Sequence, residues 1–167
     1  LIDREDTGEK AAKRFINHFS DKFAEYQKAF VAQNIKWDTG LKIASLVQRE
    51  AGGKADMPVI ASILWNRLDI GMKLDIDATV QYVIGNSENG WWPKIASKDK
   101  EVQSPYNTYR VKGLPPAPIS NPGIDAIEAV LHPAKTKCLY YLHDANRVIH
   151  CATTYEEHQA NIRKYLK

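Results

Sequence analysis

Glu50 is the residue whose type and position most directly indicate chemistry in this sequence. It lies near the end of a helix predicted over residues 42–51, on nearly the same line of the helix surface as Ile43 and Val47 at ~100° per residue. The one acidic side chain of this helix therefore projects from an apolar stripe. Desolvation and the negative carbonyl end of the helix, marked by Gly52-Gly53, should both raise its pKa. A glutamate that stays protonated near neutral pH is what a general acid requires.

A second interpretation of Glu50 needs no chemistry. Most helical glutamates are solvated, and this side chain could swing outward to pair with Arg49 or Lys54. The helix alone leaves both interpretations open.

The elements that must position Glu50 are mainly helices. Residues 8–35 carry aromatic side chains at i, i+4, i+8 and i+11, which predicts a packing helix without chemistry. Asp38-Thr39-Gly40 is expected to cap the helix of Glu50. Asp56 opens a further helix over residues 58–68, and Asp77 is a good N-cap for the helix after it.

Strand-like runs complete the prediction of an α+β fold, in which helices pack against a modest, mainly antiparallel sheet and form a groove. The predicted strands lie around Leu74 and over residues 106–111, 139–143 and 148–152. The last two form a hairpin that is flanked by the two cysteines, Cys138 and Cys151. A cross-strand disulfide and two independent thiols are both compatible with this placement.

Composition limits the classes of function. The chain has 167 residues, of which 44% are hydrophobic and 26% charged, as in an ordinary soluble globular protein. The formal charge of +3 is too small and too dispersed for a nucleic-acid-binding protein, although it suits a polymer that carries carboxylates. The sequence contains no CxxC, P-loop or GxSxG motif, and we expect neither a metal nor a cofactor.

Two loops could contribute to a groove. Trp91-Trp92 lies in a polar, irregular segment, where paired tryptophans serve either as a plug in the core, the more frequent use, or as a platform for a sugar ring. Residues 113–118 form a short proline-rich run that could build one stiff wall. The chain starts at Leu1 without an initiator methionine, so we expect it to be part of a longer protein.

An ordered series of short motifs resembles one family across nearly the whole chain after Thr39. The motifs are Ala44-Ser45-Leu46-Val47-x-x-Glu50, Asn66-Arg67-Leu68, Gly71-Met72-x-Leu74-x-x-Asp77-x-Thr79-Val80-x-Tyr82, Ser104-Pro105-Tyr106-Asn107-Thr108-Tyr109, Gly113-Leu114-Pro115-Pro116, Ile119-x-Asn121-Pro122-Gly123 and Thr154-Tyr155-Glu156-Glu157-His158. Together they resemble the endolytic murein transglycosylases of the MltG/YceG-like type. Asp75 and Ala78 depart from the residues usual in that family.

The resemblance implies that Glu50 is the single catalytic acid/base. It would protonate the bond between N-acetylmuramic acid and N-acetylglucosamine, and then accept the proton of the muramoyl 6-hydroxyl as a 1,6-anhydro end forms. Peptidoglycan strands would be the substrate, with cell-wall synthesis proteins as further partners. Residues 1–167 would be the catalytic domain of a membrane-anchored parent protein at the extracytoplasmic face of the bacterial cytoplasmic membrane, without the family's N-terminal membrane helix and LysM-like subdomain.

The resemblance also marks a set of residues as candidates for substrate contact, with a structural hydrogen bond as the alternative for each. The candidates are Asn66, Arg67, Asp77, Ser104, Tyr106, Asn107, Thr108 and Tyr109. Arg67 could meet a substrate carboxylate, but we favour a structural pair with Asp77. We further expect Asn107 and Tyr109 to line the same cleft as Glu50. Glu157 and His158 belong to the last motif, and we assign them packing or a structural salt bridge.

Two alternatives to a lytic transglycosylase remain. A peptidoglycan-binding module or scaffold would keep the groove without turnover. A hydrolytic muramidase would need a second acid, for which Asp77 and Asp75 are the nearby candidates.

Overall fold

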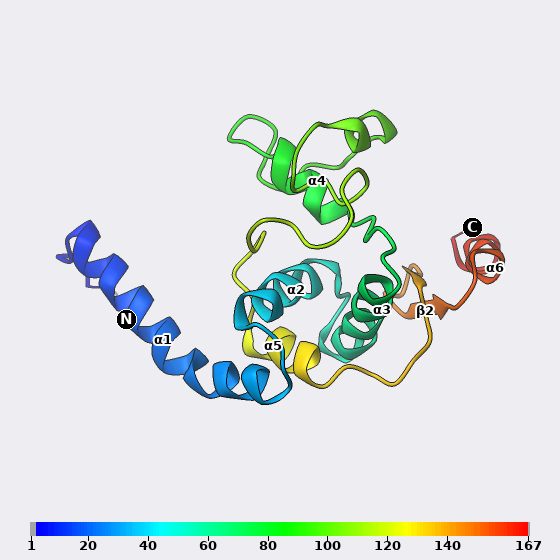
Figure 1. The fold of residues 1–167 in the computed structure, drawn as a ribbon. Coiled ribbons are helices and arrows are strands. Elements are labelled where there is room, and N and C mark those ends of the chain that lie inside the picture. The colour runs from blue at the N-terminus through cyan, green and yellow to red at the C-terminus, as the bar shows by residue number, and fades with distance from the viewer. Residues whose placement is uncertain (1–2, 167) are drawn as a thin grey trace. The chain divides into compact units, whose positions relative to one another are not determined.

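The computed structural model describes residues 3–166 and divides the chain into two compact units, residues 1–37 and 38–167, each of which is described by itself. The first unit consists mainly of α1 (Gly8–Ala32), which confirms the predicted N-terminal helix (Figure 1). The Thr7 side chain caps it by accepting a hydrogen bond from the Lys10 N–H. The Phe19 and Phe23 rings stack at 5.1 Å, as the aromatic periodicity predicts.

The core of the second unit is built from α2 (Trp37–Glu50), α3 (Met57–Asp69) and α5 (Ile124–Leu131), with η1 (Lys54–Asp56) between the first two (Figure 1). The apolar stripe predicted on α2 is fully buried, with Ile43 and Val47 both 0% exposed. The predicted cap at residues 38–40 is wrong, because α2 already begins at Trp37 and these residues form its first turn. Burial of Gly40 and Leu41 shows that this first turn belongs to the packed helix.

A less regular region contains α4 (Asp77–Ile84) and η2 (Ser97–Glu101), which pack against each other. The strands predicted around Leu74 and over residues 106–111 are wrong, since both segments lie outside any sheet. Asn107 explains the second failure. Its side-chain oxygen accepts a hydrogen bond from the Tyr109 N–H, and its backbone oxygen accepts bonds from Arg110 and Val111. These local bonds hold the segment in turns that a strand ladder cannot accommodate.

The predicted hairpin is confirmed. Strands β1 (Tyr140–His143) and β2 (Ile149–Ala152) pair antiparallel, with Tyr141 opposite Cys151. Helix α6 (Tyr155–Tyr165) packs against both strands. The structure therefore has the predicted α+β class, with a sheet of two strands among the described residues.

The ends of the hairpin are fixed locally. Cys138 and Cys151 form a disulfide with a Cα–Cα distance of 5.8 Å, which decides between the two states that the sequence left open. Thr154 and Glu157 form a reciprocal capping box at the start of α6. Within residues 3–166, no helix is both long enough and apolar enough to span a membrane.

Candidate active site

Glu50 is the last residue of α2, and the chain turns immediately after it. The turn brings Gly52 against the hairpin, where a Cβ would lie 2.8 Å from the Asp56 Oδ2 atom and 3.2 Å from the carbonyl oxygen of Arg147. A glycine leaves room for this close approach without displacing the Asp56 side chain or the backbone at Arg147. The carboxyl end of α2 can therefore lie directly beside β1.

Strand β1 supplies the main side-chain partner of Glu50. The Tyr141 hydroxyl donates a hydrogen bond of 2.6 Å to the Glu50 Oε2 atom. Two residues further along the strand, the His143 Nε2 atom lies 3.1 Å from the Asp56 Oδ2 atom. Alternate residues of a strand point to the same face, so one face of β1 contacts both acids that flank the turn after α2. Sequence reasoning did not identify Tyr141, and the pair at positions 141 and 143 of the predicted strand was the available signal.

The surroundings of Glu50 favour its protonated form. Burial raises the pKa of the Glu50 carboxyl above its ordinary value. The hydrogen bond from Tyr141 and the N–H of Ala78 lower this pKa, whereas the negative charge of Asp77 raises it, and burial prevails. Burial and the neighbouring Glu50 also raise the pKa of Tyr141 well above its ordinary value. Tyr141 therefore keeps its proton and acts as a donor near neutral pH.

The cations that could have paired with Glu50 have other partners. The Arg49 guanidinium lies over the Trp92 ring, 3.6 Å from its centroid. The Lys54 Nζ atom lies 2.7 Å from an oxygen of Asp125. In the part of the chain that the structure describes, Glu50 has no ion pair. The interpretation of Glu50 as a surface residue paired with Arg49 or Lys54 is therefore wrong.

Asp77 lies beside this site but does not cap α4. It is the first residue of that helix, Ile76 takes the N-cap position, and no side chain caps the end. The Asp77 carboxylate instead accepts a hydrogen bond from the Tyr109 hydroxyl and lies 3.3 Å from the Lys100 Nζ atom. Burial, followed by the bond to Asp77, raises the pKa of Tyr109. Tyr109 and Glu50 are close enough for the charge of Glu50 to contribute to that shift.

Arg67 and Asn66 have structural partners. The Arg67 side chain is buried, and it donates hydrogen bonds of 2.6 Å to the carbonyl oxygens of Leu139 and Leu74. Its ion-pair partner is Asp75, at 3.7 Å, so the expected pair with Asp77 is wrong. The Asn66 amide donates to the carbonyl oxygens of Thr136 and Cys138. These bonds tie α3 to the segment that leads into β1.

The Ser-Pro-Tyr-Asn-Thr-Tyr motif is only partly at the surface. Asn107 is 0% exposed, and its amide donates to the backbone oxygens of Lys100 and Val102, so the prediction that it lines a cleft is wrong. Thr108 is equally buried and accepts a hydrogen bond from the Ile76 N–H. The Ser104 hydroxyl accepts the Tyr106 N–H within the turn. The Tyr106 ring packs against Tyr82 at 5.0 Å.

The remaining marked residues lie in other surroundings. Trp91 is 68% exposed, so the interpretation of Trp91-Trp92 as a core plug is wrong. Glu157 belongs to the capping box of α6, and the His158 ring stacks on Tyr140 at 5.4 Å. Burial, with the charge of Arg67, lowers the pKa of His158.

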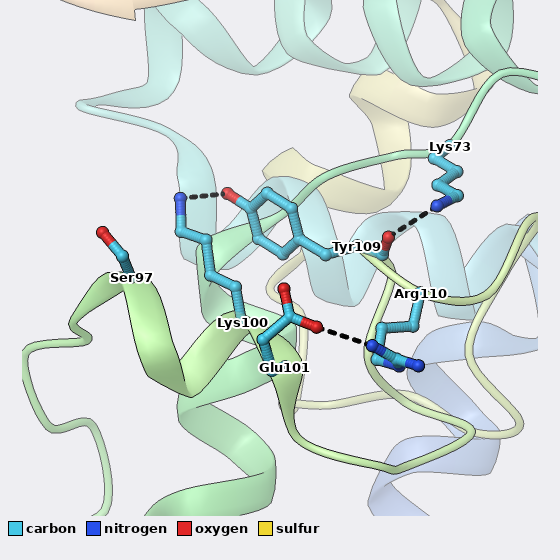
Figure 2. Close-up of a pocket in the computed structure, with 6 residues that line it drawn as sticks. All are labelled: Lys73, Ser97, Lys100, Glu101, Tyr109 and Arg110. Carbon is cyan, nitrogen blue, oxygen red and sulfur yellow. Dashed lines mark hydrogen bonds and ion pairs between the residues drawn. The ribbon is translucent and has the colours of Figure 1, made fainter.

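A pocket of about 420 Å³ has Tyr109 in its wall and is lined mainly by charged residues (Figure 2). Its lining residues are Lys73, Ser97, Lys100, Glu101, Tyr109 and Arg110. Tyr109 is thus shared between this pocket and the group of residues around Glu50. Among the described residues, no cluster of three or more histidine, cysteine, aspartate or glutamate side chains could hold a metal ion.

Comparison with known proteins places the chain in a family. The model of the YceG-like family matches residues 1–164, and the chain belongs to that family. An endolytic murein transglycosylase of Bacillus subtilis (strain 168) is 37% identical over 158 residues, which are 95% of this chain and 43% of that protein. One from Streptococcus pneumoniae serotype 2 (strain D39) is 30% identical over 143 residues, 84% of this chain and 26% of that protein.

A solved structure supports the same assignment. The 2.6 Å crystal structure of a YceG-like protein from Listeria monocytogenes matches with a TM-score of 0.85 and 35% identity, over 96% of this chain and 50% of that one. The chain therefore spans half or less of the length of each of these relatives.

Proposed function

We propose that this chain is the catalytic part of an endolytic lytic transglycosylase that cuts peptidoglycan strands. The observation that carries the proposal is the state of Glu50: its carboxyl group is desolvated, bound by Tyr141 and without an ion pair among residues 3–166. A carboxyl group with a raised pKa in such surroundings can deliver a proton at neutral pH. The family and the names of the similar transglycosylases support the substrate class.

In the first step, protonated Glu50 transfers its proton to the glycosidic oxygen between N-acetylmuramic acid and N-acetylglucosamine. The bond from C1 of the muramoyl residue to that oxygen breaks, and N-acetylglucosamine leaves with a new hydroxyl. Glu50 becomes negatively charged as this happens. The Tyr141 hydroxyl and the Ala78 N–H donate to this anion, and both groups are in place before the reaction.

In the second step, the 6-hydroxyl of the same muramoyl residue attacks C1. Glu50 takes the proton of that hydroxyl, which restores the protonated carboxyl and closes a 1,6-anhydro ring. The nucleophile belongs to the substrate, so a single carboxyl group acts in turn as acid and base, and no water is consumed. Asp77, the candidate second acid of a hydrolytic enzyme, is held by Tyr109 and Lys100.

The wider setting follows from the same proposal. Cleavage inside strands would shorten or release glycan chains during cell-wall assembly, where cell-wall synthesis proteins would be partners. We place this activity at the extracytoplasmic face of the bacterial cytoplasmic membrane, in a membrane-anchored parent protein.

Mass spectrometry of the products tests the proposal. Purified glycan strands incubated with the chain should yield anhydro-muramoyl ends, which are lighter by one water than hydrolytic ends. Glu50→Gln should lower the rate by a factor of ~10²–10⁴ or more, because general acid catalysis and general base catalysis are both lost. Glu9→Gln, at an exposed position near the start of α1, is the matched control and should leave the rate unchanged.

Three outcomes contradict the proposal. Hydrolytic ends would identify a muramidase. Binding of strands without any product would identify a binding module or scaffold. Anhydro ends released by Glu50→Gln at the wild-type rate would remove Glu50 from the chemistry.

A further inference from the structure

The structure points to a second binding site beside Glu50. We infer that the pocket lined by Lys73, Lys100, Tyr109 and Arg110, here called the basic pocket, binds a carboxylate of the peptide stem carried by the glycan strand. The inference rests on the proposed function, because it names the part of that substrate which the pocket takes.

The basic pocket is assembled from three chain segments. Lys73 lies in the irregular segment between α3 and α4, Lys100 belongs to η2, and Tyr109 and Arg110 belong to the turn that follows Asn107. Figure 2 shows the Lys73 and Lys100 side chains directed toward opposite ends of Tyr109. The Lys73 Nζ atom donates to the Tyr109 backbone oxygen at 2.9 Å, and the Lys100 Nζ atom donates to its hydroxyl at 2.9 Å.

The charges of the basic pocket are unequally compensated. The Arg110 guanidinium forms an ion pair with the Glu101 carboxylate, with 2.6 Å between nitrogen and oxygen. The Lys100 Nζ atom forms another with an oxygen of Asp77 at 3.3 Å. For Lys73, the partner in the described structure is a neutral carbonyl oxygen. An ammonium group has three N–H donors, so two remain for a ligand. The pocket therefore offers one uncompensated positive charge and free donors, which match one carboxylate.

The position of the basic pocket relative to Glu50 fits the geometry of the substrate. Tyr109 forms a wall of the pocket, and its hydroxyl donates a hydrogen bond to Asp77. The next residue, Ala78, has the N–H that lowers the pKa of Glu50. In peptidoglycan the stem branches from the muramoyl residue, which is one of the two sugars at the bond to be broken. A strand whose muramoyl residue lies at Glu50 would therefore carry its stem close to Tyr109. The sugars themselves are uncharged, so the ionised carboxyls of the strand belong to the stem.

Arg67 does not compete for this role. It was the sequence candidate for meeting a substrate carboxylate, but its side chain is buried and donates to backbone oxygens. Lys73 is exposed and has donors to spare.

The test compares two muropeptides with the same sugars and stem, one with free carboxyls and one with every stem carboxyl converted to a carboxamide. Binding is measured by calorimetry to the full chain carrying Glu50→Gln, which prevents turnover. We expect the free-carboxyl ligand to bind about 5- to 10-fold more tightly, as for a partly exposed charge-assisted hydrogen bond. Adding Lys73→Gln should remove this difference, and 0.5 M salt should reduce it.

Lys135→Gln, an exposed lysine in the connection between α5 and β1, is the matched control and should keep the difference. Equal binding of the two ligands, or a difference that persists in Lys73→Gln, would overturn the inference. Initial rates of the wild-type chain on strands with free and with amidated stems provide a second measurement that needs no Glu50 variant. Turnover without discrimination would refute the basic pocket alone, whereas discrimination without anhydro products would refute the transglycosylase proposal alone.

Discussion

Tyr141→Phe tests whether the hydrogen bond to Glu50 serves catalysis. The substitution removes one hydroxyl, keeps the ring and leaves the Glu50 Oε2 atom without its donor at 2.6 Å. A hydrogen bond to a charged group is worth about 1.5–3 kcal/mol, and Glu50 becomes charged as it gives up its proton. If this stabilisation is expressed fully in the transition state, kcat should fall by about 10- to 150-fold.

The pH dependence separates catalytic positioning from a structural role. Because the Tyr141 bond lowers the pKa of Glu50, its loss should move that pKa further up. Glu50 must be protonated to act as the acid, so the alkaline limb of kcat/KM should move to higher pH. The assay is the rate of anhydro-end formation from uncrosslinked strands between pH 4 and 10.

Tyr140→Phe is the matched control, since Tyr140 lies on the opposite face of β1 and its ring contacts His158 and Tyr155. This variant should keep the wild-type rate and pH profile. A Tyr141→Phe enzyme within twofold of wild type, with an unmoved alkaline limb, would refute the reasoning. A fall in rate with an unchanged profile would assign Tyr141 a structural role.

Two further predictions concern stability. Burial raises the folded-state pKa of Glu50 above its ordinary value of 4.5. The contribution of Glu50 to the free energy of unfolding is therefore greatest below pH 4.5 and declines as the pH rises through the folded-state pKa. Glu50→Gln should therefore have a higher Tm than wild type at pH 8 and a smaller advantage at pH 4; an equal difference at both pH values would contradict this. The disulfide joins residues 13 apart, and its removal in Cys138→Ser/Cys151→Ser should cost about 3 kcal/mol, or roughly 6–12 °C in Tm. An unchanged Tm by calorimetry would count against a stabilising disulfide.

The parts of the fold that the sequence predicted correctly are those set by local patterns. The 3.6-residue period gave the apolar stripe of α2 and placed Glu50 at its end. The two strand-like runs beside the turn at residues 144–146 gave the hairpin, whereas the pairing of the two cysteines stayed open until the structure decided it. In each case a pattern within a short stretch of sequence suffices to define the element.

The errors arose where contacts between distant segments or side-chain bonds decided the conformation. Residues 106–111 have the composition of a strand, but the Asn107 side chain satisfies the local backbone and the segment folds into turns. Asn107 and Thr108 have polar side chains that suit sugar hydroxyls equally well. Their burial depends on packing against segments around Lys100 and Ile76, which no local pattern reveals.

The partner of Glu50 illustrates the same limit. Tyr141 lies 91 residues from Glu50, so no periodicity within one element could connect them. The Asn66-Arg67 motif explains how the contact is maintained. Asn66 binds the carbonyl oxygen of Cys138, and Arg67 binds that of Leu139, the residue before β1. These two bonds fix the entry into the strand from one side, and the bond from Cys138 to Cys151 fixes it from the other.

The Asn66-Arg67 motif can therefore affect the position of Tyr141 through the backbone of the segment that enters β1. A strand shifted by one residue would present Tyr140 or Leu142 in place of Tyr141, because side chains alternate between the two faces. Bonds from α3 to two consecutive carbonyl oxygens oppose such a shift. The position of the Tyr141 hydroxyl at the Glu50 carboxyl thus depends on polar residues whose hydrogen bonds to this segment reach only the backbone. Residue type alone cannot distinguish that role from direct substrate contact.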